Sequence, residues 1–525
     1  MLYLGGILLL VLAIALAAVR DVQRKRSSRL PPGPPGLPLV GNALQLPFQF
    51  LWYRLDEWSK QYGSMYTIWL LGYPFIVLNS VDAASDVLDR LSAVTSDRPR
   101  FLKGQFFGTQ HSVVSKNNTA EWRNQRKAIH ANLGIRNISR FRDLQTYDAA
   151  HLALGLLEHP EKPFEEHIHR YAGSVIFRTL YGGDAFPHLG EDPSKIIEHL
   201  QKELLHALQP QNSVVDMLPF LKPIIERSKW LRRQGDNWYE KTTREATRLY
   251  EGAVPREGWW TIAHDFETNL KKYGMDKHGA VWVALTLYMA GQDTTNTALR
   301  VFALGILHNP DVMKAAEAQI DAVCGSRPPT LEDRENLPYI EALVKESVRW
   351  KPGVPMGVMH TASEDFEYRG YVIPEGTNFI DNIWGQTRDT AVYRDPEAFN
   401  PSRFLDASGK LLPEDTRSDL LGFGRGRRAC PGRDYALSSL FIAISTMIWA
   451  FRFQWPVDAN GNRVVCGVNE IEDHVHVATP RPFGVALKPR HKRLGKHLLG
   501  SMKESAARLY LATPQTGDYI RSQKF

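Results

Sequence analysis

The sequence predicts a mainly α-helical protein with small β-sheets, preceded by one N-terminal transmembrane helix. Residues 281–299 and 435–451 are apolar over lengths typical of buried helices. Residues 65–71 and 75–79 are short, partly β-branched runs on either side of a glycine-proline turn, which is typical of a β-hairpin. Residues 2–19 carry no charge and are just long enough to cross a bilayer.

The composition excludes several classes of protein. Of the 525 residues, 43% are hydrophobic and 23% are charged, as in a globular protein with a sizeable core. The three cysteines, Cys324, Cys430 and Cys466, are too few and odd in number for a disulfide framework, which indicates a reducing compartment. The net charge of +7 is dispersed without a basic stripe, so nucleic acid is not an expected partner.

The N-terminal segment has the pattern of an uncleaved signal anchor. A basic cluster beginning at Arg20 follows the apolar run, which keeps that flank in the cytosol. Nothing basic precedes the run, as it would in a cleavable signal peptide. The proline-rich residues 30–38 form either a semi-rigid spacer or a simple linker. We therefore expect a transmembrane anchor at 1–19 and a basic, proline-rich hinge at 20–42.

A cysteine loop at residues 423–432 is the most specific feature of the chain. Cys430 lies between a loop rich in glycine and arginine and the apolar run at 435–451. Nearby arginines and a following helix N-terminus both favour the thiolate, which is the metal-ligating form of cysteine. Pro431 suits the first turn of that helix. Our hypothesis is that Cys430 is an axial thiolate ligand of a haem iron; the alternative is a small core residue beside a solvated turn.

A second unusual motif interrupts the apolar run at 281–299. Residues 290–295 read Ala-Gly-Gln-Asp-Thr-Thr, which places a glycine and a charged residue in the middle of a buried helix. Glycine there costs about 1 kcal/mol relative to alanine, and an unpaired buried carboxylate costs more. Such a local violation often marks a functional site; the alternative is an internal cap or kink at Asp293 and Thr294.

Two residue pairs have helical spacing. Trp122 and Arg126 are four residues apart, so they share one helix face. Glu346 and Arg349 are three apart in a segment rich in apolar residues, so we expect a buried ion pair, which must be fully hydrogen-bonded. Without other information, these patterns indicate an amphipathic helix and a charge pair.

Together these motifs resemble those of the cytochrome P-450 family. Phe423, Gly426, Arg428, Cys430 and Gly432 fall at every position that the family's haem-binding signature fixes. The Trp-x-x-x-Arg pair, the 290–295 motif, the Glu-x-x-Arg pair and a Pro-Ser-Arg-Phe segment at 401–404 occur in the family's order. The resemblance covers roughly residues 30–490, so it implies the cytochrome P-450 fold for a domain at 43–490, with a proline-rich spacer before it.

The resemblance implies a haem b site with Cys430 as the iron ligand. The other implied cofactor-binding residues are Trp122, Arg126, Phe423, Arg428 and His360, the last with a purely structural histidine as the alternative. Arginine suits the haem propionates because its planar fork binds two carboxylate oxygens. Asp293 and Thr294 are the implied catalytic pair, which relays protons from solvent to bound dioxygen. The candidate pocket residues are Phe106, Phe107, Ala290, Val354 and Met356; for the two phenylalanines the alternative is to anchor the loop 101–118.

Residues Glu346, Arg349 and Arg403 form a structural lock in the resembled family. We expect this lock to serve folding and haem retention rather than chemistry. The sequence also predicts a strand within 352–359, a hairpin around 374–376, an irregular segment at 381–403, and short strands near 451–454, 464–465 and 480–487.

The implied activity is that of a haem-dependent monooxygenase oxidising a lipophilic small molecule with O2 and electrons from NADPH. The implied partners are NADPH–cytochrome P-450 reductase, cytochrome b5 as a second candidate donor, and the lipid bilayer, with the domain on the cytosolic side of the endoplasmic reticulum. A general likeness to fungal enzymes favours a terpenoid, polyketide or alkaloid intermediate of secondary metabolism. The alternatives are a haem-thiolate isomerase or dehydratase that does not use O2, and a non-catalytic haem protein; the intact Asp293–Thr294 pair argues against both.

Several segments keep two interpretations. The basic extension at 491–525, with loosely helical Leu494, Leu498, Met502 and Leu509, either contacts the membrane or is disordered. The apolar residues 213–225 belong to the core or form a second membrane contact. Arg425 and Arg427 face either the reductase or solvent. Under the expected topology the glycosylation sequons at Asn117 and Asn137 are chance matches.

Overall fold

The computed structural model describes residues 16–17, 19–25, 28–182, 193–208, 226–253, 260–415, 419–474 and 477–512. The predicted anchor lies outside these ranges apart from residues 16, 17 and 19, and residues 213–225 lie outside them entirely. Within the described ranges, no helix combines the length and the apolar composition that a bilayer crossing needs.

Most described elements are helices, accompanied by small sheets. The helices are α2 (Leu51–Tyr62), α3 (Val81–Ala84), α4 (Leu102–Phe106), α5 (Ala120–Leu133), α6 (Arg142–Glu158), α7 (Phe164–Tyr181), α8 (Pro193–Leu208), α11 (Lys229–Ala253), α12 (Ile262–Thr268), α13 (Leu270–Tyr273), α14 (Lys277–His308), α15 (Pro310–Cys324), α16 (Pro338–Trp350), α17 (Ile383–Gln386), α18 (Arg433–Ala450) and α19 (Leu494–Ala512). The strands are β1 (Met65–Leu70), β2 (Tyr73–Leu78), β3 (His360–Thr361), β4 (Phe366–Tyr368), β5 (Tyr371–Ile373), β6 (Asn378–Asp381), β7 (Phe451–Gln454), β8 (Ile471–Asp473), β9 (Ala478–Pro480) and β10 (Ala486–Pro489). The mainly helical prediction is therefore confirmed.

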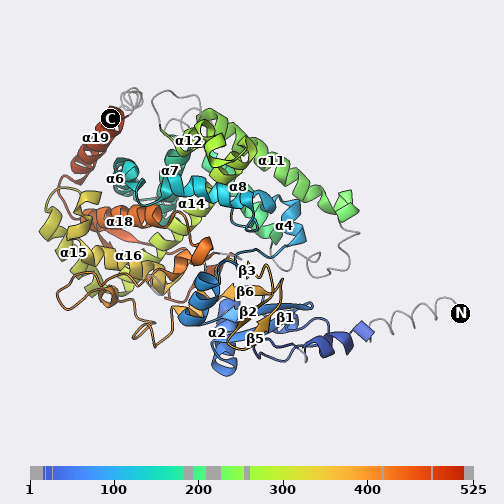
Figure 1. Cartoon of the computed structure of the whole chain (residues 1–525). Coiled ribbons are helices and arrows are strands. Elements are labelled where there is room, and N and C mark those ends of the chain that lie inside the picture. The colour runs from blue at the N-terminus through green and yellow to red at the C-terminus, as the bar shows by residue number, and fades with distance from the viewer. Residues whose placement is uncertain are drawn as a thin grey trace.

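Helix α14 runs through the helical part of the molecule (Figure 1) and organises it. It begins where the carboxylate of Asp276 accepts the N–H of Gly279 at 2.7 Å, and it continues without a break to His308. It contacts α7, α16 and α18, the last of which is buried at every residue from Leu437 to Ala450. Both apolar runs of the sequence thus form central helices, as predicted.

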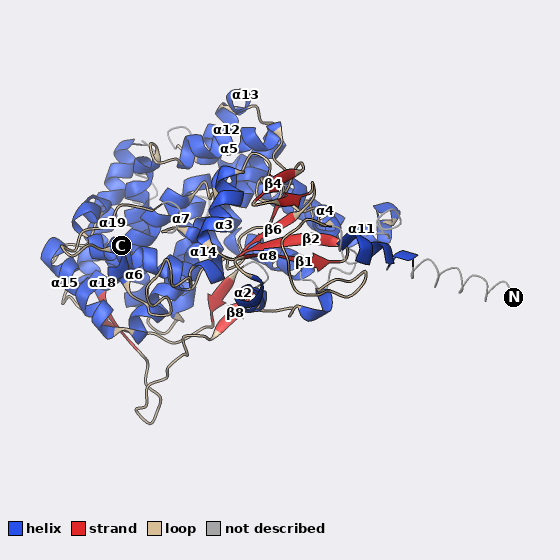
Figure 2. Cartoon of the chain, turned by 60° about the horizontal axis from the view of Figure 1, so that its bottom comes forward, coloured by secondary structure: helices blue, strands red, loops and turns tan. Residues whose placement is uncertain are grey.

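The largest sheet has the order β1-β2-β6-β3 and lies toward the N-terminal end of the molecule, away from most of the helices (Figure 2). β1 and β2 form the predicted antiparallel hairpin, with Thr67 opposite Ile76 and a turn at Leu71 and Gly72. β6 pairs in parallel with β2, which joins segments about three hundred residues apart in the chain. Both faces of the hairpin are buried, because α2 covers one of them and α3 the other.

Three strand predictions were wrong. The strands on either side of residues 374–376, β5 and β6, do not pair with each other, so no hairpin forms there. β5 pairs instead with β4 through a tight turn at Arg369 and Gly370. β6 pairs with β2 on one edge and with β3 on the other. Residues 352–359 are irregular, since the two prolines remove strand donors, and only β3 follows them. Val464 and Val465 are exposed and form no strand, because nothing covers their apolar side chains. β7 occurs where it was predicted, and β9 and β10 lie at the two ends of the predicted 480–487 segment.

Over residues 494–512 the C-terminal extension is a helix and not a disordered tail, and the predicted membrane contact stays a prediction. It forms α19, which packs along α6 on the side of the molecule opposite the N-terminus (Figure 1). Leu494, Leu498 and Met502 are buried there at four-residue spacing, as an amphipathic helix requires. Arg508 adds an ion pair to Asp143 at 2.5 Å. The interpretation as a disordered tail is therefore wrong for this part, because α6 supplies an apolar partner that the local sequence does not show.

Candidate active site

The cysteine loop is fixed by backbone contacts on both sides. The N–H of Cys430 donates to the carbonyl of Phe423 at 2.7 Å, so Phe423 contributes its backbone to the loop. Gly426 has a φ of 54°, and a Cβ there would come within 2.0 Å of the Leu88 carbonyl oxygen. Its N–H donates to the carboxylate of Asp89 at 2.5 Å. The loop therefore needs glycine at this position in order to lie against the segment that follows α3.

Cys430 has the environment predicted for a thiolate ligand. Burial raises the pKa of its thiol, while the N–H of Gly432 and the nearby cations Arg126 and Arg433 lower it. Cys430 is nevertheless exposed. An accessible sulfur near a helix N-terminus and two guanidinium groups is suited to bind a metal.

The two arginines whose roles were left open differ. Arg425 is buried and lies 3.6 Å from Asp89 and 3.8 Å from Asp381, and it donates to the side chain of Gln386 at 2.8 Å. It faces neither a reductase nor solvent, so both interpretations were wrong for this residue. Arg427 is exposed, as predicted.

Two residues in the middle of α14 are exposed between long buried stretches of the same helix. Every residue from Gly279 to Tyr288 and from Leu299 to Leu307 is buried, whereas Ala290 and Thr294, one turn apart between them, are exposed. The hydroxyl of Thr294 donates to the carbonyl of Ala290 at 2.7 Å. The helix is neither capped nor broken here, so the alternative of an internal cap or kink is not observed.

The glycine of this motif has a packing role. A Cβ at Gly291 would approach the side chain of Ile176, on α7, to 3.1 Å. Its small size therefore permits the close contact between α7 and α14. Asp293, two residues on, accepts a hydrogen bond from the side-chain amide of Gln201 of α8 at 2.6 Å. Burial raises the pKa of Asp293, and the charge of His169 lowers it.

Three guanidinium groups gather beside Trp122, on the cysteine-loop side of α5. Arg428 lies 3.9 Å from the centre of the Trp122 ring, and Arg126 lies 5.7 Å from it. Burial lowers the pKa of Arg428 to about 9 and that of Arg98 well below its usual value, and the cations repel one another. Among the described residues, none of the three has a carboxylate within ion-pair distance.

This cation cluster fits the haem propionates. Burying a guanidinium group destabilises the fold unless an anion compensates its charge. The three arginines donate hydrogen bonds to backbone carbonyls, which are neutral and leave the positive charge uncompensated. Two carboxylates placed here would supply the missing negative charge, and Cys430 lies in the same loop as Arg428. The thiol, the accessible stripe of α14 and the cationic cluster therefore all suit haem b.

Arg98 is a site residue that the sequence did not single out. It comes from the segment before α4, and its Nη1 donates to the carbonyls of Val358 and Met359, both at 2.6 Å. His360, which was predicted instead, donates its Nδ1–H to the Thr95 carbonyl at 2.8 Å, and burial keeps its pKa well below the usual value. A propionate contact by His360 remains a prediction, and it would require protonation of Nε2.

Substitution of Arg98 by leucine is expected to weaken haem binding by about 10- to 100-fold, because one charge-assisted donor is lost from a cation cluster. The measurement is the haem dissociation rate during transfer to a haem-scavenging protein. Arg123→Leu, which removes an exposed arginine of α5 that is not part of the cation cluster, is the control and should have no effect. Equal retention of haem by both variants would exclude Arg98 from the site.

The predicted pocket residues are not equivalent. Phe107 is buried against Trp238 of α11, with ring centres 5.6 Å apart, and Phe106 packs against Gly235 of the same helix. These contacts favour the anchoring alternative, and they arise because residues 101–118 contain α4 and a 3-10 turn rather than a simple loop. Met356 packs beside the sheet and Val354 is half-buried, so Ala290 is the one predicted pocket residue that lies on the exposed stripe of α14.

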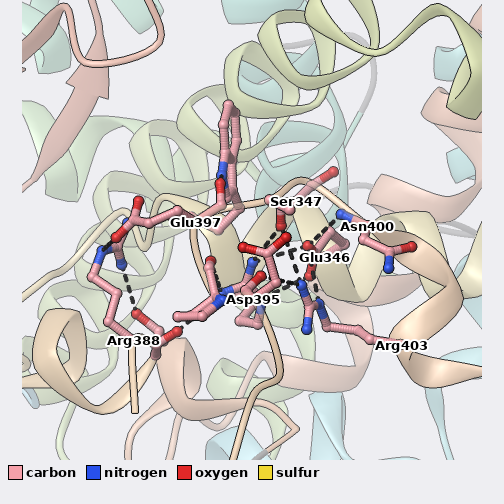
Figure 3. A network of polar contacts seen from close by, with 12 residues as sticks. Glu346, Ser347, Arg388, Asp395, Glu397, Asn400 and Arg403 are labelled. Atoms are coloured by element: carbon pink, nitrogen blue, oxygen red, sulfur yellow. Dashed lines mark hydrogen bonds and ion pairs between the residues drawn. The ribbon is translucent and has the colours of Figure 1, made fainter. Parts of the chain in front are cut away.

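The structural lock assembles as predicted (Figure 3). Both carboxylate oxygens of Glu346 accept from Arg349, at 2.7 and 2.9 Å, and Arg403 reaches the same carboxylate at 3.3 Å. The N–H of Asn400 donates to Glu346 at 2.7 Å. The two arginines also bind carbonyls between residues 387 and 398, so the pair holds the irregular segment that leads to the cysteine loop.

The fold and site together define a haem-thiolate protein. Residues 31–464 match the cytochrome P-450 family model. The chain is 35% identical over 510 residues to cytochrome P-450 monooxygenase 58 of Postia placenta, covering 93% of this chain and 94% of that one, and 36% identical over 492 residues to a cytochrome P-450 monooxygenase of Armillaria gallica, covering 91% and 94%. A solved zebrafish cytochrome P-450 with abiraterone has the same fold, with a TM-score of 0.68 and 21% identity over 84% of this chain and 100% of that chain. The chain belongs to the cytochrome P-450 family; it is a haem-dependent monooxygenase whose electrons come from NADPH through a reductase.

Proposed function

We propose that this monooxygenase oxidises a terpenoid, polyketide or alkaloid intermediate of fungal secondary metabolism. The observation that supports a lipophilic substrate is the exposed stripe of α14, where Ala290 and Thr294 are accessible between long buried segments of an apolar helix. The relatives that supply the fungal context are curated as cytochrome P-450 monooxygenases of fungi. The experiment is a panel of such compounds, scored by the substrate-induced spectral shift and by product formation that depends on both NADPH and O2.

In this proposal each side chain has a defined task. Haem, when bound, supplies the iron at which dioxygen is activated. Cys430 provides the thiolate ligand, and Arg98, Arg126 and Arg428 neutralise the propionates. The exposed hydroxyl of Thr294 can hold a proton beside the reacting centre. Asp293, the neighbouring residue on α14, supplies protons to that hydroxyl, and its pKa is raised by burial.

Substitution of Thr294 by alanine is expected to uncouple electron use from product formation. The fraction of NADPH electrons recovered in product should fall at least about tenfold, because a positioned proton donor is lost. Thr286→Ala is a matched control, since Thr286 makes the same 2.7 Å bond to a carbonyl four residues earlier on α14 but is buried. Unchanged coupling in Thr294→Ala, with the substrate spectral shift intact, would remove Thr294 from the relay.

We also propose that the protein is anchored in the endoplasmic reticulum membrane and receives electrons from a membrane-bound reductase, with cytochrome b5 as a second donor. Large apolar side chains are exposed at Leu44 and Phe48, after the proline-rich segment, and at Trp230, where α11 begins. Helix α11 lies toward the same side of the molecule as the N-terminus (Figures 1 and 2). Arg123 and Lys127 are exposed on α5 and supply positive charge for an acidic donor. Fractionation of the full chain against a chain lacking residues 1–19 tests the anchor.

A further inference from the structure

Two histidines and a tyrosine meet where three separate elements of the fold come together. His111 ends the 3-10 turn that follows α4, Tyr239 belongs to α11, and His278 lies in the first turn of α14. Nε2 of His278 is 3.4 Å from Nδ1 of His111 and 3.3 Å from the hydroxyl oxygen of Tyr239. None of the three residues is fully buried. The cysteine site uses none of them.

Hydrogen bonds alone satisfy this arrangement poorly. An imidazole nitrogen carries either one proton or one lone pair, so Nε2 of His278 can make one good hydrogen bond but not two. Both of its contacts, at 3.3 and 3.4 Å, are longer than the roughly 2.7–3.2 Å of a good hydrogen bond. In a tetrahedral zinc site with bonds of about 2.0–2.1 Å, neighbouring ligand atoms lie roughly 3.3–3.4 Å apart. The observed spacing therefore suits ligands that share one cation.

Aromatic packing holds the three rings in these positions. The His111 ring stacks on the Tyr239 ring, with centres 5.2 Å apart, and meets the His278 ring edge-on at 4.9 Å. Trp282, one turn further along α14, has its ring centre within 6.3 Å of all three. Ligand atoms that are positioned before the cation arrives lose little conformational entropy when it binds.

The charges around His111 leave its ring able to bind a cation. Burial lowers the pKa of His111, and so do His278 and Lys116. The ring is therefore neutral near neutral pH, and a neutral imidazole is the form that binds metals. The Lys116 ammonium forms an ion pair with Glu121, which offsets its repulsion of a cation, and the Asp276 carboxylate contributes negative charge nearby.

We propose that His111 and His278 bind one divalent cation of the zinc and copper class, with the Tyr239 hydroxyl as the third ligand and water in the remaining position. Each imidazole binds through the lone pair of the nitrogen named above and carries its proton on its other nitrogen. Imidazole ligands suit these metals. Among the described residues, no three histidine, cysteine or carboxylate side chains form a metal site, so the tyrosine is needed as a donor. The bound cation ties the turn after α4 to both α11 and α14.

The first test is a zinc titration of the ferric holoenzyme, free of any affinity tag, by isothermal titration calorimetry. His111→Phe and His278→Phe keep a ring at each position but remove the ligand nitrogen, so each should lose one equivalent of bound zinc. Tyr239→Phe should weaken binding by about tenfold or more. His308→Phe is the matched control, since His308 ends the same helix and its ring packs on Trp455. Zinc binding equal to that of the control in both histidine variants would overturn the proposal.

X-ray absorption at the zinc edge tests the ligands without any substitution. The unaltered holoenzyme with one equivalent of zinc should show two imidazole ligands, with zinc–ligand distances of about 2.0–2.1 Å. A shell of oxygen ligands alone would overturn the proposal, even if a variant failed to fold. Persistence of the two-imidazole signal in a folded His111→Phe protein would place the zinc elsewhere and would overturn it as well.

Hydrogen exchange tests whether the cation acts as a clamp. Zinc at 100 times its Kd should slow backbone exchange in residues 109–116 by up to about 100-fold, because only the closed arrangement brings the three ligands together. The same zinc concentration should leave exchange in His278→Phe unchanged. Equal exchange with and without bound zinc in the unaltered protein would overturn the clamp.

Discussion

Substitution of Cys430 by serine is expected to abolish the thiolate-type band of the reduced, CO-bound difference spectrum and to lower turnover by more than about a hundredfold. Loss of a group that only hydrogen-bonds to a metal ligand lowers metal affinity or activity by about 10- to 100-fold, and here the ligand itself is replaced. A serine hydroxyl does not ionise near neutral pH, so the nearby cations cannot produce an equivalent anionic ligand. The electron density that a thiolate supplies to a haem iron is then lost.

The other two cysteines provide the control for this experiment. Cys466 and Cys324 are both free and buried, and burial raises the pKa of Cys324 to about 11 and that of Cys466 above its usual value. Serine at either position should leave the spectrum unchanged. If Cys430→Ser retained the thiolate-type band, the central assignment of this site would be wrong.

Substitution of Glu346 by glutamine is expected to destabilise the protein by about 3–5 kcal/mol, because it leaves two buried guanidinium groups without their counter-charge. Glu346 is fully buried and accepts from Arg349, Arg403 and the N–H of Asn400. The measurements are the denaturant midpoint followed by tryptophan fluorescence and the fraction of purified chain that contains haem. Both should fall, since the segment that Glu346 orders leads directly to the cysteine loop.

Glu341→Gln tests whether this cost is specific. Glu341 lies on the same helix, and its carboxylate binds Arg334 at 2.7 Å through both oxygens, but Arg334 is about one-third exposed. Water can solvate Arg334 when Glu341 is neutralised. This variant should therefore lower the free energy of unfolding by only about 1 kcal/mol. Similar losses from the two variants would show that the three-residue lock is no more important than an ordinary ion pair of α16.

Features set by short-range chemistry could be predicted from the sequence. The apolar runs form α14 and α18, Trp122 and Arg126 share α5, and the hairpin of β1 and β2 forms around its turn. The order of the cysteine loop, the Asp293–Thr294 pair and the Glu346–Arg349 pair was enough to indicate the family and its cofactor. Each of these signals lies within about one helix or one turn, where spacing in sequence fixes spacing in the structure.

Only the tertiary structure decided which distant segments share an environment. Arg98 completes the cation cluster because β3 and the segment before α4 meet beside α5, and nothing near Arg98 in the sequence marks it. Gln201 reaches Asp293, and the tail forms α19, because α8 and α6 provide partners that are far away in the chain. The predicted hairpin around 374–376 failed for the same reason, since β6 found its partners in β2 and β3. A local pattern specifies which face of an element is apolar or charged, whereas burial and pairing depend on contacts that only the folded chain brings together.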